Sequence, residues 1–232
     1  MHLRKDMSKE NAMLGINDYG RELTKEELDT GYHRQFIGGM WEEIGLLQFN
    51  FMKEQGLEPK HKILDIGCGC LRGGLHFIGY LDQGNYYGLD VNRSVLKGGI
   101  LEVRKSNLIS KKPNLMVSDK FIISKFKTQF DFMISVSLFT HLPMNMIVRC
   151  LVQVRNHLKP KGTYYSSFFE SPTNAHIDPL KHGEIITYYD KDPFHYSAEE
   201  LTMMADLAGL GIKIIGDWGH PRHQRMAAFF VK

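Results

Sequence analysis

Two stretches of the sequence contain residues whose types and spacing could bind a nucleoside. Gly67, Cys68 and Gly69 follow a short aliphatic run, and Asp90 ends a second apolar run roughly 20 residues later, the spacing that places an acid on ribose hydroxyls. Glycines at a turn let the backbone lie against a ligand, because they carry no Cβ. Together these residues favour a nucleoside-bearing cofactor over a purely structural turn.

The elements that must position these residues are a strand, a tight turn and a helix. Residues 63–66 are predicted to form a buried strand, because the run is short, mostly aliphatic and followed by glycine. Leu71, Leu75, Ile78 and Leu81 then recur at helical spacing. In such a unit the backbone N–H groups of the turn and the helix N-terminus face the ligand.

The run from Asp65 to Gly69 resembles the first motif of the class I S-adenosylmethionine (SAM)-dependent methyltransferases, which reads acid-x-Gly-x-Gly. The resemblance covers about residues 60–232, and within the superfamily the chain is similar to small bacterial methyltransferases that act on metabolites or sugars. A dinucleotide fingerprint would instead require glycine at position 72, where the chain has Arg72.

The resemblance implies SAM as the cofactor and S-adenosylhomocysteine (SAH) as the product. It also implies an α/β fold with a single doubly wound, Rossmann-like, seven-stranded and mostly parallel sheet. Helices are expected on both faces, and a C-terminal antiparallel hairpin strand is expected to complete the sheet. This hairpin and Arg72 both disfavour a nicotinamide-dependent oxidoreductase.

The cofactor site implied by the resemblance lies at the carboxyl ends of the strands. Asp90 is expected to accept from the ribose hydroxyls, Val91 to lie beside adenine, and Asp119 to lie near the adenine amino group, although an Asx turn is an alternative for Asp119. The Gly67 and Ser135 carbonyls are expected to receive the ammonium group. The complete predicted set is Asp65, Gly67, Cys68, Gly69, Arg72, Asp90, Val91, Asp119 and Ser135.

The acceptor is expected to approach the loops that follow the fourth and fifth strands. His141 is the leading candidate for a general base, because imidazole titrates near neutral pH. The alternative is a structural histidine that bonds only to backbone at a helix start. Residues 170–195 show no helical or strand period, and a loop this long is usually functional or disordered. Its predicted acceptor contacts are His176, Tyr188, Tyr189 and His195, with Asp178 and His182 as further candidates.

The expected organisation is an N-terminal flexible segment or flap, residues 1–31, followed by one methyltransferase domain, residues 32–232, with the acceptor-side insert at residues 170–195. Helix starts are predicted at Thr24, Asn92 and Ser197 from their capping patterns. Apolar residues from Ile37 to Phe51 indicate one long helix, which either forms part of a lid or packs on the sheet. Whether the segment 220–224, between the last two strands, reaches the acceptor is left open.

Composition restricts the partners that we expect. A net charge of +3 is too small to indicate nucleic acid as a partner. Three cysteines cannot form a disulfide framework, and Cys68-x-Cys70 lacks the second pair that a zinc site needs, so we predict no metal. No apolar run is long enough to span a bilayer, and a cytoplasmic location is expected. The oligomeric state is not predicted.

The favoured hypothesis is a SAM-dependent methyltransferase that acts on a hydroxyl of a small molecule, such as a sugar or secondary metabolite. The fourth strand ends in Ser135-Val136-Ser137-Leu138, without the (Asp/Asn)-Pro-Pro-aromatic run typical of exocyclic-amine methylation. The alternatives are a protein or RNA acceptor, a nicotinamide-dependent oxidoreductase, and a non-catalytic SAM-binding protein.

Overall fold

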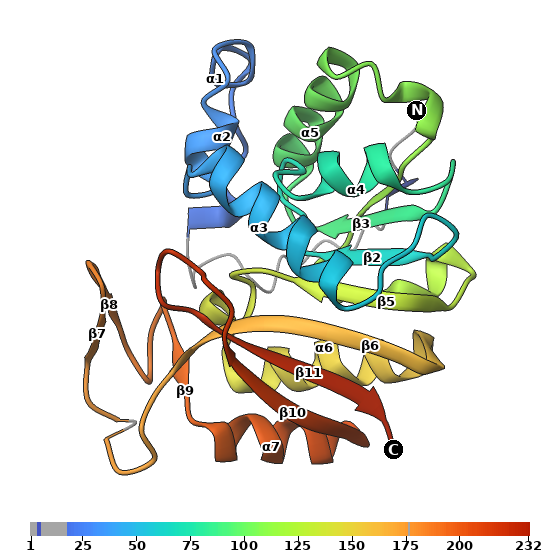
Figure 1. Cartoon of the computed structure of the whole chain (residues 1–232). Coiled ribbons are helices and arrows are strands. Elements are labelled where there is room, and N and C mark those ends of the chain that lie inside the picture. Colours follow the sequence, from blue (N-terminus) through green and yellow to red (C-terminus); the bar gives the residue numbers. More distant parts are fainter. Residues whose placement is uncertain (1–3, 6–17, 176) are drawn as a thin grey trace. The chain divides into compact units, whose positions relative to one another are not determined.

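The computed structural model describes residues 4–5, 18–175 and 177–232. These residues fall into two compact units, Met1–Asp119 and Lys120–Lys232 (Figure 1). Within the described residues, no helix is long and apolar enough to cross a membrane. Most of the segment predicted as a flap, residues 1–3 and 6–17, lies outside the described residues.

The sheet of the first unit is parallel, with the strand order β1-β4-β3-β2. Every residue of β2 is buried, as expected for a parallel strand that is covered on both faces. The carboxyl ends of β2 and β3 therefore meet at one edge, where Gly67, Gly69 and Asp90 lie. The strands are β1 (Arg4–Lys5), β2 (Ile63–Ile66), β3 (Tyr86–Asp90) and β4 (Asn114–Val117).

Two helices of the first unit, α1 and α5, begin where the capping patterns predict. Thr24 forms a capping box with Glu27, and the Asn92 side chain accepts from the backbone of Ser94 and Val95. The α-helices are α1 (Lys25–Asp29), α2 (His33–Phe36), α3 (Trp41–Glu54), α4 (Gly74–Tyr80) and α5 (Arg93–Lys105). Two 3-10 helices, η1 (Asp18–Gly20) and η2 (Ile109–Lys111), complete the unit.

The single helix predicted from Ile37 to Phe51 is wrong. The chain is broken at Gly38 and Gly39, whose φ angles of +94° and +63° are incompatible with a right-handed helix, so α3 begins only at Trp41. Figure 1 shows α3 running beside α4, and Gly45 permits this approach: a Cβ there would lie 2.7 Å from the Arg72 carbonyl oxygen.

The sheet of the second unit has the strand order β5-β6-β11-β10. β5 and β6 are parallel, whereas β11 is antiparallel to both β6 and β10, so the predicted reversal at the C-terminus is confirmed. The two-residue strand β1, which pairs with β4 in the first unit, was not predicted. The elements are β5 (Phe130–Ser135), β6 (Leu158–Glu170), β9 (His195–Tyr196), β10 (Leu210–Asp217), β11 (Arg225–Val231), α6 (Met144–His157), α7 (Ala198–Leu207), η3 (Ile123–Phe126) and η4 (Phe139–His141).

An aromatic cluster in the second unit fixes the short helix η4. Phe139, Tyr164 and Phe229 are fully buried, with ring centroids 5.6–6.1 Å apart. Aromatic pairs at such separations contribute roughly 0.5–1.5 kcal/mol beyond their burial. Because Phe139 is anchored in this way, the position of His141 two residues later is also defined.

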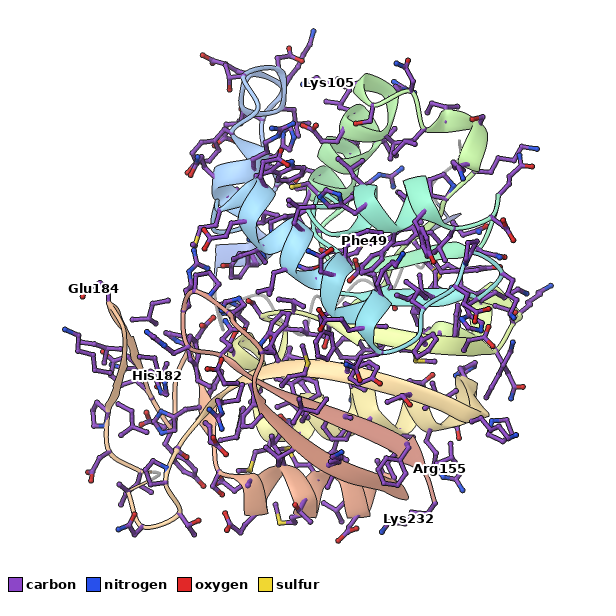
Figure 2. The ribbon with its side chains drawn as sticks, viewed as in Figure 1. Phe49, Lys105, Arg155, His182, Glu184 and Lys232 are labelled. Atoms are coloured by element: carbon purple, nitrogen blue, oxygen red, sulfur yellow. The ribbon has the colours of Figure 1, made fainter. Side chains whose placement is uncertain are left out.

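The insert contains a small hairpin that the sequence pattern did not predict. β7 (Leu180–His182) and β8 (Ile185–Thr187) pair antiparallel, and Gly183 with φ +60° makes the turn. Figure 2 shows His182 on this hairpin and Glu184 at its exposed tip. Strands of three residues are too short to show a period of two, which explains why this segment reads as a loop. His176 lies outside the described residues.

Candidate functional site

The glycine turn of the first unit crosses the end of β3. Gly67, Gly69 and Leu71 have φ angles of +73°, +56° and +70°. The backbone N–H groups of Gly67 and Cys68 donate to the Leu89 carbonyl at 2.7 and 3.1 Å. The turn is therefore fixed to the neighbouring strand by its own backbone, and it presents a surface with few side chains.

Asp90 ties this turn to the segment that follows β3. Its Oδ2 accepts from the Gly69 N–H at 2.9 Å, and its Oδ1 accepts from the Asn92 N–H at 2.8 Å. Burial raises the pKa of Asp90, and the backbone N–H groups around it partly offset that effect. Each carboxylate oxygen retains further capacity to accept a hydrogen bond, because a carboxylate offers about four lone-pair positions.

Asp65 and Cys68 lie inside the first unit. The buried Asp65 carboxyl accepts from the Tyr86 hydroxyl at 2.9 Å, and burial raises its pKa to about 7. A Cβ at Gly88 would lie 2.9 Å from Cys68 Sγ, so this thiol packs tightly against β3. Burial also raises the pKa of Cys68, which makes the thiol a poor nucleophile.

Arg72 connects the glycine turn to the break before α3. Its side chain is buried, and Nη1 donates to the Gly39 carbonyl at 2.8 Å. Nearby, the Cys70 thiol donates to the His33 carbonyl at 3.3 Å. The segment around α2 therefore lies directly against the turn. Trp41 is half-buried and packs beside Cys70, Val95 and Leu23.

A buried carboxylate that sequence reasoning missed holds this segment to α5. Glu102 Oε1 lies 2.8 Å from His33 Nε2, and both Glu102 oxygens accept from the Arg34 guanidinium at 3.1 and 2.6 Å. Arg34 also lies over the Trp41 ring, 4.5 Å from its centroid. Burial alone would raise the pKa of Glu102, but the hydrogen bonds from Arg34 and His33 outweigh burial and lower it.

The other predicted cofactor residues lie in different surroundings. Val91 is half-buried directly after β3, and Asp119 is buried two residues after β4. Ser135 ends β5 in the second unit, where its hydroxyl lies 2.6 Å from the Tyr164 hydroxyl and 2.8 Å from Ser166 Oγ. These contacts involve the side-chain hydroxyl, whereas the contact predicted for Ser135 is through its backbone carbonyl.

His141 in the second unit is paired with a carboxylate. Its Nδ1 lies 2.7 Å from Asp192 Oδ1, and the two side chains are 23% and 12% exposed. Sequence reasoning missed Asp192, because nothing in its neighbourhood links it to a histidine 51 residues earlier. The pair is sheltered, and the imidazole remains partly accessible.

The predicted acceptor residues are not equally accessible. His195 is fully buried, with Nδ1 2.7 Å from Thr187 Oγ1. Tyr189 is exposed, and Tyr188 has the Lys191 ammonium 4.0 Å from its ring centroid. His195 is therefore placed to support the insert, whereas the two tyrosines are closer to the surface.

The segment between the last two strands lies against the insert. A Cβ at Gly183 would lie 3.3 Å from the His223 ring. Burial, together with His195 and His223, lowers the pKa of His182, whose ring lies 4.7 Å from that of Phe169. The hairpin and this segment thus form one histidine-containing surface within the second unit.

Comparison with known proteins agrees with this geometry. A family model described as a methyltransferase domain matches residues 64–164, which include the glycine turn, Asp90 and His141.

Solved structures with the same fold are methyltransferases of low sequence identity. An S-adenosylmethionine-dependent methyltransferase from Clostridium acetobutylicum ATCC 824 is 12% identical, with a TM-score of 0.64 over 89% of this chain and 98% of that chain. Magnesium protoporphyrin IX methyltransferase (ChlM) from Synechocystis PCC 6803, with bound SAH, is 12% identical, with a TM-score of 0.67 over 96% of this chain and 100% of that chain. The glycopeptide N-methyltransferase MtfA is 15% identical, with a TM-score of 0.60 over 81% of this chain and 90% of that chain.

The methyltransferase domain, the Rossmann-like fold and the acid-x-Gly-x-Gly turn agree with one another. Residues 64–164 therefore match a methyltransferase domain, and the fold of the chain is the one found in S-adenosylmethionine-dependent methyltransferases.

Proposed function

We propose that the chain transfers the methyl group of SAM to a hydroxyl of a small molecule, such as a sugar or a secondary metabolite, with His141 as the general base. The match of residues 64–164 to a methyltransferase domain, and the likeness to methyltransferases solved with SAM or SAH, support SAM as the methyl donor and SAH as the product. The observation that carries the choice of a hydroxyl is the His141–Asp192 pair, with 2.7 Å between its atoms. A hydroxyl must lose a proton when it is methylated, and a partly accessible imidazole beside a carboxylate is suited to accept it.

The glycine turn and the end of β3 fit the adenosine part of SAM. The turn has positive φ angles at Gly67 and Gly69, so its backbone can lie close to a ligand. Asp90 retains acceptor capacity for two ribose hydroxyls, and Val91 offers apolar surface to adenine. The remaining proposed contacts are those of Asp65, Cys68, Arg72, Asp119 and Ser135.

The chemistry left to the protein is positioning and the removal of one proton. SAM supplies a methyl carbon whose bond to sulfur breaks with both electrons kept by sulfur. The acceptor oxygen uses a lone pair for the new bond, and its proton passes to Nε2 of His141. The protonated imidazole then carries its charge beside Asp192, which remains a carboxylate.

The test is an acceptor screen with the wild-type protein and SAM. The screen contains monosaccharides, nucleotide sugars and phenolic metabolites, and also small amines, peptides and RNA, because MtfA is an N-methyltransferase. SAH release identifies the acceptor, and NMR of the product locates the methyl group. We expect an O-methylated small molecule. Transfer only to nitrogen, or only to a peptide or RNA, would contradict the proposal.

A further inference from the structure

The loop that carries Asp192 is fastened to the segment that carries His141. The Phe194 N–H donates to the Thr140 carbonyl at 2.7 Å, and the Tyr196 hydroxyl donates to the Leu142 carbonyl. These bonds flank His141 on both sides in the sequence. The contact between His141 and Asp192 is therefore part of an ordered attachment of the insert to η4.

The same loop is also held from its other side. The Tyr188 N–H donates to the Pro193 carbonyl at 2.8 Å, and the His195 N–H donates to the Tyr188 carbonyl at 3.1 Å. Residues on both sides of Asp192 thus have fixed backbone partners. Because the Asp192 side chain is only 12% exposed, solvent screens its interaction with His141 less than it screens a surface pair.

The geometry determines which imidazole nitrogen can act as a base. A carboxylate only accepts hydrogen bonds, so His141 Nδ1, 2.7 Å from Asp192 Oδ1, must carry the proton. In the neutral ring the lone pair then lies on Nε2. Without the carboxylate, nothing in this pair would favour that tautomer.

We propose that Asp192 is a positioning residue for methyl transfer: it holds His141 in the tautomer whose Nε2 accepts the hydroxyl proton, and it stabilises the imidazolium that results. This inference rests on the proposed role of His141 as the base. The proton moves from the acceptor oxygen to Nε2, the Nδ1 proton stays in place, and Asp192 does not change its protonation. The competing explanation is that the His141–Asp192 pair has a structural role alone and holds the insert in place.

The decisive readout is the tautomer of His141, which requires neither the acceptor nor SAM. Long-range ¹H–¹⁵N correlation spectra of the labelled protein, recorded about two pH units above the ordinary imidazole pKa of ~6.5, show which ring nitrogen is protonated. We expect Nδ1–H at His141 in the wild type. His157 is the internal control, because its Nδ1 must donate to the Gln153 carbonyl at 2.7 Å and should remain protonated in every variant.

Two variants complete the test. In Asp192→Asn the side-chain amide can both donate and accept, so Nε2–H should become substantially populated at His141. Turnover should fall by roughly 10²-fold, the lower end of what a general base contributes, with SAH affinity unchanged. Asp192→Glu keeps a carboxylate and should recover the Nδ1–H tautomer and part of the turnover.

Several results would overturn the inference. An Nε2–H tautomer in the wild type would do so without any variant, even if Asp192→Asn fails to fold. If the His141 tautomer is unchanged in Asp192→Asn, or if it changes while turnover stays full, Asp192 has a structural role and not a positioning role. Failure of the proposed function is a separate observation, because it appears as wild-type protein that methylates no hydroxyl in the acceptor screen.

Discussion

The glycine turn of the first unit and the insert of the second unit are built in different ways. The turn is contiguous in sequence, follows a fully buried strand, and is fixed by backbone N–H groups that donate to Leu89 and Asp90. The insert has only short strands, and it is attached through separate contacts such as Asp192 to His141 and Phe194 to Thr140. The first arrangement can be recognised from two short sequence motifs, whereas the second depends on contacts between residues far apart in the chain that no motif marks.

This contrast suggests a division of work. A turn whose backbone N–H groups are held by the neighbouring strand suits the recognition of a cofactor such as SAM. An insert attached by a few separate contacts can change without disturbing the sheet, and loops on a rigid scaffold commonly carry specificity. We therefore expect changes in the first unit to affect cofactor affinity, and changes in the insert to affect turnover.

The largest effect is expected from His141→Ala. Loss of the general base should reduce turnover by roughly 10²–10⁴-fold, while SAM affinity stays nearly the same. Kinetics with the acceptor found in the screen, together with calorimetry, measure the two quantities. His157→Ala is the matched control, because this histidine lies at the end of α6 and its Nδ1 donates to the Gln153 backbone carbonyl. A stable His141→Ala protein with full turnover would remove His141 from the chemistry.

The next effect concerns the first unit. Asp90→Ala removes the charged acceptor of the ribose hydroxyls, and losing a hydrogen bond to a charged group costs about 1.5–3 kcal/mol. SAM affinity should therefore fall by roughly 10- to 100-fold. Thermal melting must accompany the calorimetry, because Gly69 and Asn92 lose a partner as well. Asp82→Ala, at an exposed position, is the control. Unchanged affinity in a folded Asp90→Ala protein would place the ribose elsewhere.

A smaller effect is expected on stability from the Glu102 cluster. The pKa of Glu102 is lowered, so its ionised form stabilises the fold above the unfolded pKa of ~4.3, and this contribution is lost as pH falls through the folded pKa. Glu102→Gln should cost about 1.5–3 kcal/mol at neutral pH. Below about pH 5, the free energy of unfolding of the variant should also fall less steeply with decreasing pH than that of the wild type. Denaturant melts across this pH range measure both quantities.

Glu27→Gln is the matched control for that experiment. The hydrogen bond from Arg21 lowers the pKa of Glu27 to about 2, but this ion pair is on the surface and water screens it. Its removal should therefore destabilise the fold less than the removal of the buried Glu102 carboxylate. If the free energy of unfolding falls equally in the two variants, burial of the Glu102 carboxylate does not add to the stability of the fold.

Much of the first unit could be predicted from sequence, because its signals are local. The buried strand at residues 63–66, the turn after it and the cap at Asn92 each follow from neighbouring residues. The break at Gly38 and Gly39 was missed, since apolar spacing continues through it and only the positive φ angles reveal it.

For the acceptor side, the sequence predicted which segment is involved but not the contacts within it. The sequence pattern predicted an acceptor-side insert at residues 170–195 and His141 as a candidate base, but it did not predict Asp192 as the partner of His141. A bond between side chains 51 residues apart leaves no periodic trace in one sequence. The same reason explains why Glu102 was not connected with His33 and Arg34 beforehand.

Binding calorimetry on the unmodified protein tests the central claim, a SAM site formed at the glycine turn and Asp90, most directly. Titrations with SAH and with NAD are compared under the same conditions. We predict saturable binding of SAH and no binding of NAD, because Arg72 stands where a dinucleotide fingerprint requires glycine. Binding of NAD without binding of SAH would contradict the account.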